Sequence, residues 1–516
     1  MKKTIAILLT VMMLLGMLAG CGGQKTETVQ ETPAAPAEEK TPEATAEPAE
    51  ETTTGSELEP VQLTWYIGWA QNTTDSEAVS AAITEYLKDT LNIELKLVFP
   101  GDYATQTQMA LAGGEDIDIC WTGSWGFDFL TNVAKEAFYP LDDLLAEYGQ
   151  GIVELLPEFG LDACKVNGVT YAIPNYQTWV DYNALYITEE TVAKYGFDPT
   201  TVTSYKDLEP LLAQIKEDNP SSYPLVVGYS GAPITRCRVE LNYTEISSIK
   251  NVGGVELDDE TCTVVNIFEL PQVKECFQTM WEWNQKGYLR SDSAQMAEED
   301  MIAAMQNGES VVILQTYKPG DEVTQETRFG QELVTTPYGT PVVTTGQVQA
   351  TLTAITANCK NPERAMMLLN AVNTDPVLYN MLCFGIEGVH YNLENGYAIP
   401  VDGTTYDPKD DWAIGNQFNG YLREGQSADT WEVTKALNDS AIAVPTLGFS
   451  FDPSSVSTQV AAVASVVDEY YKTLVFGALD PETIYPEFLA KLEAAGVNDI
   501  LTEMQTQIDA WLAANK

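Results

Sequence analysis

The chain has 516 residues, with 27 basic against 75 acidic side chains and a formal net charge of −48 at pH 7. Such a charge repels phosphate backbones and anionic headgroups, which excludes nucleic acid and anionic lipid as partners. The length is too great for one ordinary hydrophobic core and predicts two or three lobes.

Residues 1–20 have the three parts of a secretory signal peptide. Lysines at positions 2 and 3 precede an apolar run at 5–17, which is too short to span a bilayer, and small residues follow. The sequence Leu-Ala-Gly-Cys at 18–21 resembles the lipobox of bacterial lipoproteins. That resemblance implies cleavage before Cys21 and lipidation of its thiol. We therefore expect an exported chain held by its lipid on the outer face of the cell membrane.

The composition changes abruptly after Cys21. Residues 21–60 are dominated by Glu, Thr, Ala and Pro and hold hardly any large apolar side chain. Such a segment cannot bury enough surface to offset its ordering entropy. We expect a disordered tether with a reach of roughly 35 Å, and a folded part that begins near Pro60.

The first part of the folded chain alternates strands and helices. Residues 61–67, 93–97 and 117–121 are rich in β-forming or alternating apolar residues, and the segments between them predict helices. The first of these helices, within 76–91, places an apolar residue on one face at every turn. A β-α-β-α-β order predicts a parallel sheet covered by helices.

A second sheet is expected between about 183 and 335. The predicted elements there are a strand around Leu185 and Tyr186, helices at 189–195 and 205–217, a helix opened by Pro271, and a strand at 311–314. Farther on, residues 351–356 predict a strand, and Asn361 and Pro362 begin a helix. The last 130 residues are predicted to be mainly helical, with one apolar stripe near the end. Its members are Met504, Ile508, Trp511 and Leu512.

The seven cysteines beyond Cys21 form an odd, irregularly spaced set. They have neither the CxxC spacing nor the Cys/His spacing of metal sites. We interpret most of them as buried apolar side chains rather than as a disulfide framework.

Four segments in a fixed order resemble the extracellular solute-binding proteins of ABC importers, the family of maltose- and oligosaccharide-binding proteins. They are LAGGEDID at 111–118, FYPLDDLL at 138–145, VNGVTYAIP at 166–174 and AMQNGESVVIL at 304–314. Three further segments are similar to the LipO-like sugar-binding lipoproteins within that family. These are GIEGVHY at 385–391, GFSFDP at 448–453 and the helix ending at 507–511.

This resemblance implies an α/β fold of two lobes with a cleft that closes by hinge motion. The first lobe would comprise residues 61–180 and 338–382, the second 183–335, and a mainly helical region at 383–516 would pack on the lobes. We expect hinges near 175–182 and 337–345. Loops at the carboxyl ends of the strands would then face the cleft.

A sugar presents hydroxyls that need hydrogen-bond partners and apolar faces that suit aromatic rings. The predicted aromatic ligand-binding residues lie in strand-end loops or crossovers, where the family resemblance places the cleft. They are Trp69, Trp121, Trp125, Tyr176, Trp179, Tyr182 and Tyr317. The predicted polar ones are Thr122, Asn175, Gln177, Gln347 and Glu387. Packing beneath a loop is the alternative for each ring, and the role of Trp412 stays open.

The predicted function is therefore the capture of a carbohydrate, an oligosaccharide above all, or another small solute, as a monomer that delivers it to ABC permease subunits. We expect no enzymatic activity, no catalytic residues, no cofactor and no metal. The single histidine, His390, has neither a GxSxG nor an HExxH motif beside it, and no Walker A loop occurs. The alternatives are an exported glycoside hydrolase and a peptide-binding or sensor lipoprotein.

Overall fold

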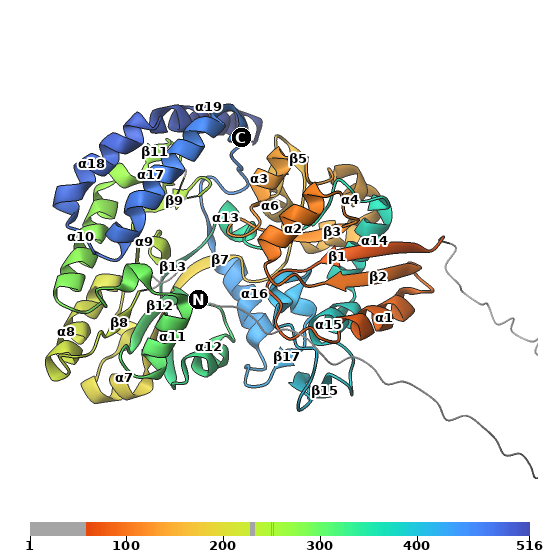
Figure 1. The fold of residues 1–516 in the computed structure, drawn as a ribbon, viewed down its shortest axis with the longest axis horizontal. Helices are drawn as coiled ribbons and strands as arrows, with labels where there is room; N and C mark the ends of the chain where they lie inside the picture. Colours follow the sequence, from red (N-terminus) through yellow and green to blue (C-terminus); the bar gives the residue numbers. More distant parts are fainter. Residues whose placement is uncertain (1–57, 228–232, 249, 251, 516) are drawn as a thin grey trace, which may run out of the picture. The chain divides into compact units, whose positions relative to one another are not determined.

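The computed structural model describes residues 58–227, 233–248, 250 and 252–515 (Figure 1). The predicted signal peptide, Cys21 and nearly all of the predicted tether lie outside these residues. The first strand of the described residues begins at Val61.

The first lobe is built on a five-stranded sheet in the order β2-β1-β3-β14-β6. Its opening elements confirm the predicted β-α-β-α-β order: β1 (Val61–Tyr66), α1 (Ser76–Leu87), β2 (Ile93–Val98), α2 (Tyr103–Ala112) and β3 (Ile119–Thr122). Strand β1 pairs in parallel with both β2 and β3. Along β2 buried and exposed residues alternate, because one face of the strand packs on the helices and the other meets solvent.

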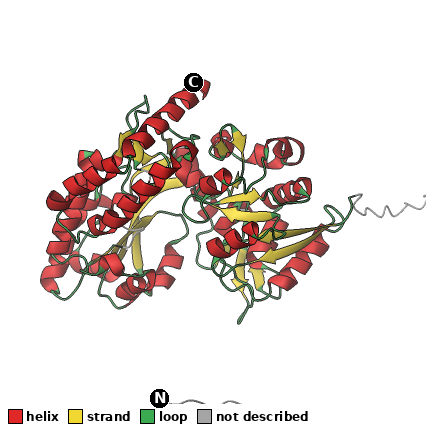
Figure 2. Cartoon of the chain, turned by 45° about the horizontal axis from the view of Figure 1, so that its top comes forward, coloured by secondary structure: helices red, strands yellow, loops and turns green. Residues whose placement is uncertain are grey.

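Helices cover this sheet, as Figure 2 shows. After β3 the chain forms α3 (Phe129–Ala134), α4 (Asp142–Tyr148), α5 (Gln150–Leu155), α6 (Glu158–Asp162), β4 (Lys165–Val166), β5 (Val169–Thr170) and β6 (Ile173–Pro174). Later it returns as β14 (Leu352–Ile355), α14 (Pro362–Thr374) and α15 (Pro376–Phe384). Strand β14 runs antiparallel to β3 and β6, so the sheet is mixed rather than wholly parallel.

The second lobe is built on a sheet in the order β18-β13-β7-β12-β8. Its elements are β7 (Val180–Thr188), α7 (Glu189–Tyr195), α8 (Glu209–Asp218), β8 (Leu225–Val226), α9 (Pro233–Arg236), α11 (Glu298–Gln306), β12 (Val312–Thr316), α12 (Glu322–Phe329), β13 (Leu333–Val343) and β18 (Ile442–Ala443). The central strand β7 pairs antiparallel with β12 and β13. The predicted second sheet is therefore present.

The C-terminal helices complete the core of the second lobe. A three-stranded sheet of β9 (Tyr243–Glu245), β10 (Gly253–Glu256) and β11 (Val265–Asn266) lies near α10 (Pro271–Gln285), α17 (Ser457–Val475), α18 (Pro481–Ala494) and α19 (Val497–Asn515). One apolar cluster joins these elements. Within the predicted stripe of α19, Met504 and Ile508 are fully buried, and Trp511 and Leu512 pack against the same cluster.

Residues 385–429 differ from the predicted helical character. They form the small sheet β15 (Tyr391–Glu394), β16 (Tyr397–Pro400) and β17 (Leu422–Arg423) and the short helices η7 (Asp411–Ala413) and η8 (Gln417–Asn419), before α16 (Thr430–Ser440). The turn between β15 and β16 is Asn395-Gly396, both at positive φ. An Asn-Gly pair of this kind is a strong hairpin signal, and the general expectation of helix did not take it into account.

Two crossovers between the lobes lie side by side. The chain passes from β6 to β7 through residues 175–179 and returns after β13, and Val180 pairs with Val343. The predicted hinge at 337–345 begins inside β13 rather than in a loop, although the register of β13 shifts between Tyr338 and Val342. Such an irregularity locally weakens the ladder.

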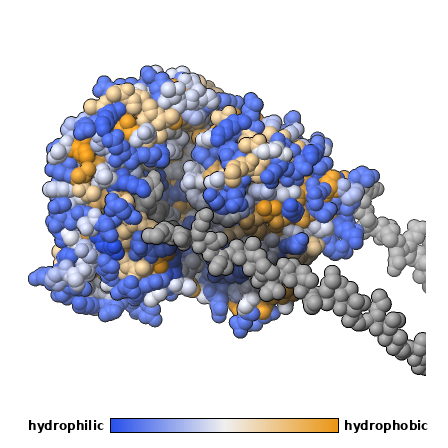
Figure 3. All heavy atoms as spheres, in the orientation of Figure 1, coloured by the Kyte–Doolittle hydropathy of each residue, from blue (hydrophilic) through white to orange (hydrophobic). Residues whose placement is uncertain are grey.

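The surface agrees with the acidic, polar composition. On the face drawn in Figure 3 hydrophilic side chains dominate and apolar residues form small patches. All seven cysteines in the described residues are buried, as predicted. Among those residues, the helices are too short or too polar for any of them to span a membrane.

Candidate functional site

Four tryptophans from distant parts of the sequence meet on the first lobe, and we call them the tryptophan cluster: Trp69, Trp121, Trp125 and Trp412. Ring centroids lie 4.5 Å apart for Trp69 and Trp125, 5.3 Å for Trp121 and Trp125, and 6.1 Å for Trp125 and Trp412. Trp121 is 1% exposed, whereas Trp69 is 39% and Trp125 is 55% exposed. The cluster therefore has a buried base and an open aromatic face.

Hydrogen bonds and close packing hold these rings in place. The indole N–H of Trp121 donates to Thr351 Oγ1 at 2.8 Å, and that of Trp125 donates to the carbonyl of Ala350 at 2.7 Å. Trp69 has a φ of 70°, a left-handed conformation that costs energy for a bulky residue and is often found at functional sites. A Cβ at Gly126 would lie 2.7 Å from the Trp69 ring, so glycine is needed there.

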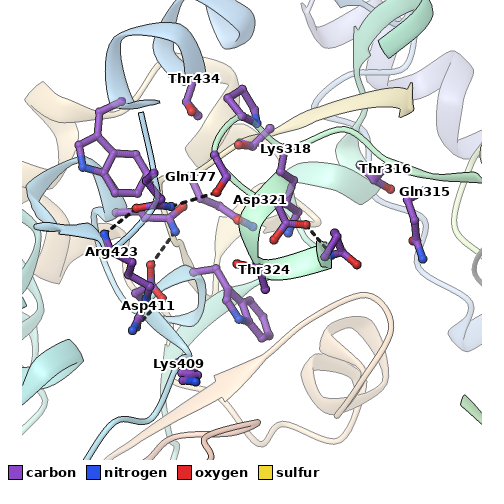
Figure 4. A pocket seen from close by; sticks show the side chains of 18 residues that line it. Gln177, Gln315, Thr316, Lys318, Asp321, Thr324, Lys409, Asp411, Arg423 and Thr434 are labelled. Atoms are coloured by element: carbon purple, nitrogen blue, oxygen red, sulfur yellow. Dashed lines mark hydrogen bonds and ion pairs between the residues drawn. The ribbon is translucent and has the colours of Figure 1, made fainter. Parts of the chain in front are cut away.

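A polar pocket of about 440 Å³ adjoins the cluster, and Trp412 lines it. Its other walls come from the first crossover, which supplies Gln177, from the second lobe, which supplies Asp321, and from the segment 409–434 (Figure 4). The volume lies within the range of small-molecule sites. The pocket thus combines one aromatic wall with many hydrogen-bonding groups.

An ion network organises one wall of the pocket. Arg423 lies 3.1 Å from Asp407 and 3.1 Å from Asp411, and the amide of Gln417 donates to Asp411 at 3.0 Å. The guanidinium also lies over the ring of Phe384, 4.7 Å from its centroid. Burial opposes ionisation of Asp411, yet Arg423 and Gln417 hold its pKa below the ordinary value. Asp411 therefore offers a fixed carboxylate to a ligand.

Asp321 faces this wall from the second lobe. Burial raises its pKa, the charge of Asp411 adds to the increase, and hydrogen bonding from Gln325 opposes it. The Gln325 amide donates to Asp321 at 2.6 Å. Donors and acceptors from both lobes are therefore directed into one pocket, an arrangement suited to ligand hydroxyls.

Several predicted ligand-binding residues have a supporting role instead. Thr122, Asn175, Tyr176 and Trp179 are buried. Asn175 donates to Thr351 Oγ1 and to the carbonyl of Ala413, each at 2.8 Å. These contacts tie the first crossover to Thr351, which also accepts the indole N–H of Trp121, and to the short helix η7 that carries Trp412. These side chains therefore support the wall from behind.

Trp179 is the largest departure from the prediction. Its ring is 1% exposed and belongs to the core of the first lobe. The indole N–H donates to the carbonyl of Asn175 at 2.9 Å, and the ring packs against Phe159 and Tyr176. The ring therefore packs beneath the crossover, as in the alternative interpretation.

The remaining predicted residues lie near the pocket or away from it. Gln177 lines the pocket. Tyr182 and Tyr317 are half-buried, with ring centroids 5.8 Å apart, and Tyr317 is the sequence neighbour of two lining residues. Gln347 is half-buried and Glu387 is exposed, and neither lines the pocket.

Sequence reasoning missed most of the pocket. Arg423, Asp411, Asp321 and Trp431 were not predicted, and the role of Trp412 was left open. The one available signal was the position of Trp412 shortly before Asn416 and Gln417. The ion network itself joins loops whose proximity depends on the fold.

The side chain of His390 has a structural role. Its Nδ1 accepts a hydrogen bond from the backbone N–H of Ile386 at 3.0 Å, which closes the 386–390 turn. The ring is 1% exposed and packs near Tyr406. Within the described part of the chain, no group of three or more His, Cys, Asp or Glu side chains is arranged to hold a metal ion.

Comparison with known proteins agrees with this geometry. A family model described as a domain of unknown function, DUF3502, matches residues 445–513. A carbohydrate ABC transporter substrate-binding protein of Streptococcus pneumoniae is 28% identical over 432 residues, which are 81% of this chain and 84% of that protein. The crystal structure of the N-glycan transport solute-binding protein NgtS from the same species is 26% identical, with a TM-score of 0.77 over 89% of this chain and all of that one.

In sequence and fold the chain is thus similar to carbohydrate-binding extracellular solute-binding proteins of ABC importers. A second NgtS structure, in complex with Man5GlcNAc, is 25% identical to this chain, with a TM-score of 0.70 over 89% of this chain and all of that one. The DUF3502 match contains the segments at 448–453 and 507–511 that resembled sugar-binding lipoproteins.

Proposed function

We propose that this solute-binding protein captures an oligosaccharide on the tryptophan cluster and in the adjoining polar pocket, and delivers it to an ABC permease. The observation that carries the proposal is the continuity of the two surfaces at Trp412, which belongs to the cluster and lines the pocket. An aromatic face suits the C–H side of a sugar ring, and the pocket groups suit its hydroxyls.

The free energies of such contacts are large enough to account for micromolar binding. A micromolar complex requires about 8 kcal/mol. Ring contacts contribute about 0.5–1.5 kcal/mol each beyond the area they bury, and hydrogen bonds to charged groups about 1.5–3 kcal/mol each. The fixed rings and the paired ions lose little freedom when a ligand binds, which lowers the cost of association.

Isothermal titration calorimetry tests the proposal. The protein is titrated with Man5GlcNAc, with a maltooligosaccharide and a fructooligosaccharide of similar size, and with a short peptide. We expect a saturating heat with at least one glycan and none with the peptide. Binding of the peptide alone would refute the carbohydrate assignment and support the peptide-binding alternative.

The same mixtures address the hydrolase alternative. Reducing ends are measured after prolonged incubation with each glycan. We expect no release, because the relatives named above are binding subunits of transporters. Turnover that disappears on replacing one carboxylate of the pocket would overturn the proposal.

Replacing Trp125 by alanine is expected to weaken glycan binding by about 1 kcal/mol or more, roughly fivefold or greater. The ring is 55% exposed, so the melting temperature should change little. Calorimetry and thermal unfolding are compared with Tyr86→Ala, an exposed aromatic residue on α1 outside the pocket. Equal affinity in both variants would show that the open face of the cluster does not contact ligand.

Membrane attachment through Cys21 is part of the proposal. The full chain, expressed in a bacterium that processes lipoproteins, should partition into detergent, and the Cys21→Ala variant should remain in the aqueous phase with unchanged glycan affinity. The reason is that the lipid anchors the chain and does not shape the site. Aqueous partition of the unaltered chain would contradict the anchor.

A further inference from the structure

A buried carboxyl without a hydrogen-bond partner, that of Asp410, lies in the sequence between the pocket-lining residues Lys409 and Asp411. The side chain of Asp410 is 0% exposed, and neither of its carboxylate oxygens has a partner among the described residues. Buried polar groups are normally satisfied, and an ionised carboxylate in this situation carries a large desolvation penalty. This group therefore needs a physical explanation.

The charged and titratable groups around Asp410 do not neutralise it. They are Asp407 and Asp411 on the same loop, Arg423 on β17, Cys383 on α15 and Tyr406. Arg423 already forms ion pairs with Asp407 and Asp411. Burial and then the charge of Asp411 raise the pKa of Asp410 to about 8, and the proximity of its own backbone N–H and the charge of Arg423 oppose the increase. The adjacent Asp411 is shifted in the opposite direction.

The loop that holds Asp410 also carries three pocket residues, Lys409, Asp411 and Trp412. It is fastened to the loop after β1. The N–H of Asp407 donates to the carbonyl of Asn72, and the N–H of Gln71 donates to the carbonyl of Pro408, each at 2.8 Å. A change in the charge of Asp410 therefore acts on a loop that reaches both the pocket and the tryptophan cluster.

We infer that Asp410 is a positioning residue: its neutral, protonated form holds Asp411 and Trp412 in their binding arrangement, and its ionisation displaces the loop and weakens ligand binding. The expected loss of ligand binding rests on the proposed function, whereas the expected displacement of the loop does not. With Arg423 shared between two neighbours, an ionised Asp410 must move toward water or draw water in.

The direction of the effect on stability follows from linkage. The folded protein keeps the proton of Asp410 at pH values where the unfolded chain, with an ordinary carboxyl, has lost it. The stabilising contribution is complete below the unfolded pKa of about 4 and is lost as pH rises toward the folded pKa of about 8. In the Asp410→Asn variant this side chain cannot ionise, so the decrease in stability with rising pH should be absent.

Tryptophan emission and thermal unfolding, followed from about pH 5 to about pH 9.5, test the inference without any ligand. The unaltered protein should show an emission change with a midpoint near pH 8 and a melting temperature that falls between pH 5 and pH 8. Asp410→Asn should show no such emission change and should melt higher at neutral pH. Asp402→Asn, an exposed aspartate nearby, should behave like the unaltered protein.

Infrared spectroscopy on the unaltered protein covers the case in which Asp410→Asn fails to fold. A protonated carboxyl band should be present at pH 7 and disappear above about pH 9, because only a carboxyl with a strongly raised pKa remains protonated at neutrality. A fully ionised carboxylate population at pH 7 would overturn the inference, and so would an identical emission transition in Asp410→Asn.

Glycan affinity completes the test, with Man5GlcNAc or whichever oligosaccharide of the panel binds. The unaltered protein should lose affinity at least threefold from pH 7 to pH 9, and Asp410→Asn should not. If no glycan binds at any pH, the proposed function fails while the emission and infrared results still decide the role of Asp410. Equal pH dependence of affinity in both proteins would refute the positioning role.

Discussion

Replacing Trp179 by alanine is expected to lower the free energy of unfolding by about 3–5 kcal/mol. The ring is 1% exposed, and a Cβ on Gly160 would lie 2.9 Å from it, so the site is closely packed. Truncation leaves a cavity and an orphaned carbonyl at Asn175, which now accepts the indole N–H. Urea unfolding followed by circular dichroism measures the change.

Trp125→Ala is the matched control for this prediction. Both changes remove one indole from the first lobe, but Trp125 is more than half exposed, and its variant should unfold within about 1 kcal/mol of the unaltered protein. Trp179→Phe, which keeps an aromatic ring, should recover part of the loss. Equal stability of Trp179→Ala and Trp125→Ala would contradict the core position of Trp179.

Replacing Arg423 by methionine is expected to lower the free energy of unfolding by about 3–5 kcal/mol at neutral pH and to weaken glycan binding. The variant leaves the charges of Asp407 and Asp411, which are 14% and 17% exposed, without their shared cation, and removing one partner of a largely buried pair is costly for this reason. Methionine keeps the volume of the side chain over Phe384. Chemical denaturation and calorimetry give the two effects separately.

The pH dependence follows from the lowered pKa of Asp411. A carboxyl whose pKa is lowered by folding contributes stability above the unfolded pKa of about 4, and the contribution is lost as pH falls through the folded pKa. The stability difference between Arg423→Met and the unaltered protein should therefore shrink in acid. A difference that stays constant down to about pH 3 would contradict the ion network as its source.

A triple variant separates packing from charge. Asp407→Asn and Asp411→Asn, combined with Arg423→Met, remove the unpaired charges and should restore much of the lost stability. Glycan affinity should stay low, because the charged hydrogen-bonding groups of the pocket wall are then absent. Recovery of affinity together with stability would show that the network serves the fold alone.

Local patterns predicted the secondary structure well where one periodicity dominated. The alternation of Ile93, Leu95 and Leu97 indicated β2, and α7 has the predicted bounds of 189–195. The stripe through Met504 and Ile508 indicated the buried face of α19. Each of these elements buries one side, so its apolar residues recur every two residues in a strand and every three to four residues in a helix. Around Asn395 the prediction was wrong because a turn signal was overlooked.

The sequence by itself determined the lobe-forming elements, the family resemblance and the presence of tryptophans after the strands of the first lobe. Only the tertiary structure decided which of them form a surface: Trp125 is exposed and Trp179 is buried, although both follow a strand. It also decided that Asp411 is held ionised while its neighbour Asp410 has no partner. Both outcomes depend on groups far away in the sequence, such as Arg423 and Ala350. The spacing of apolar residues along a segment does not predict such contacts, because they form only when the fold brings distant loops together.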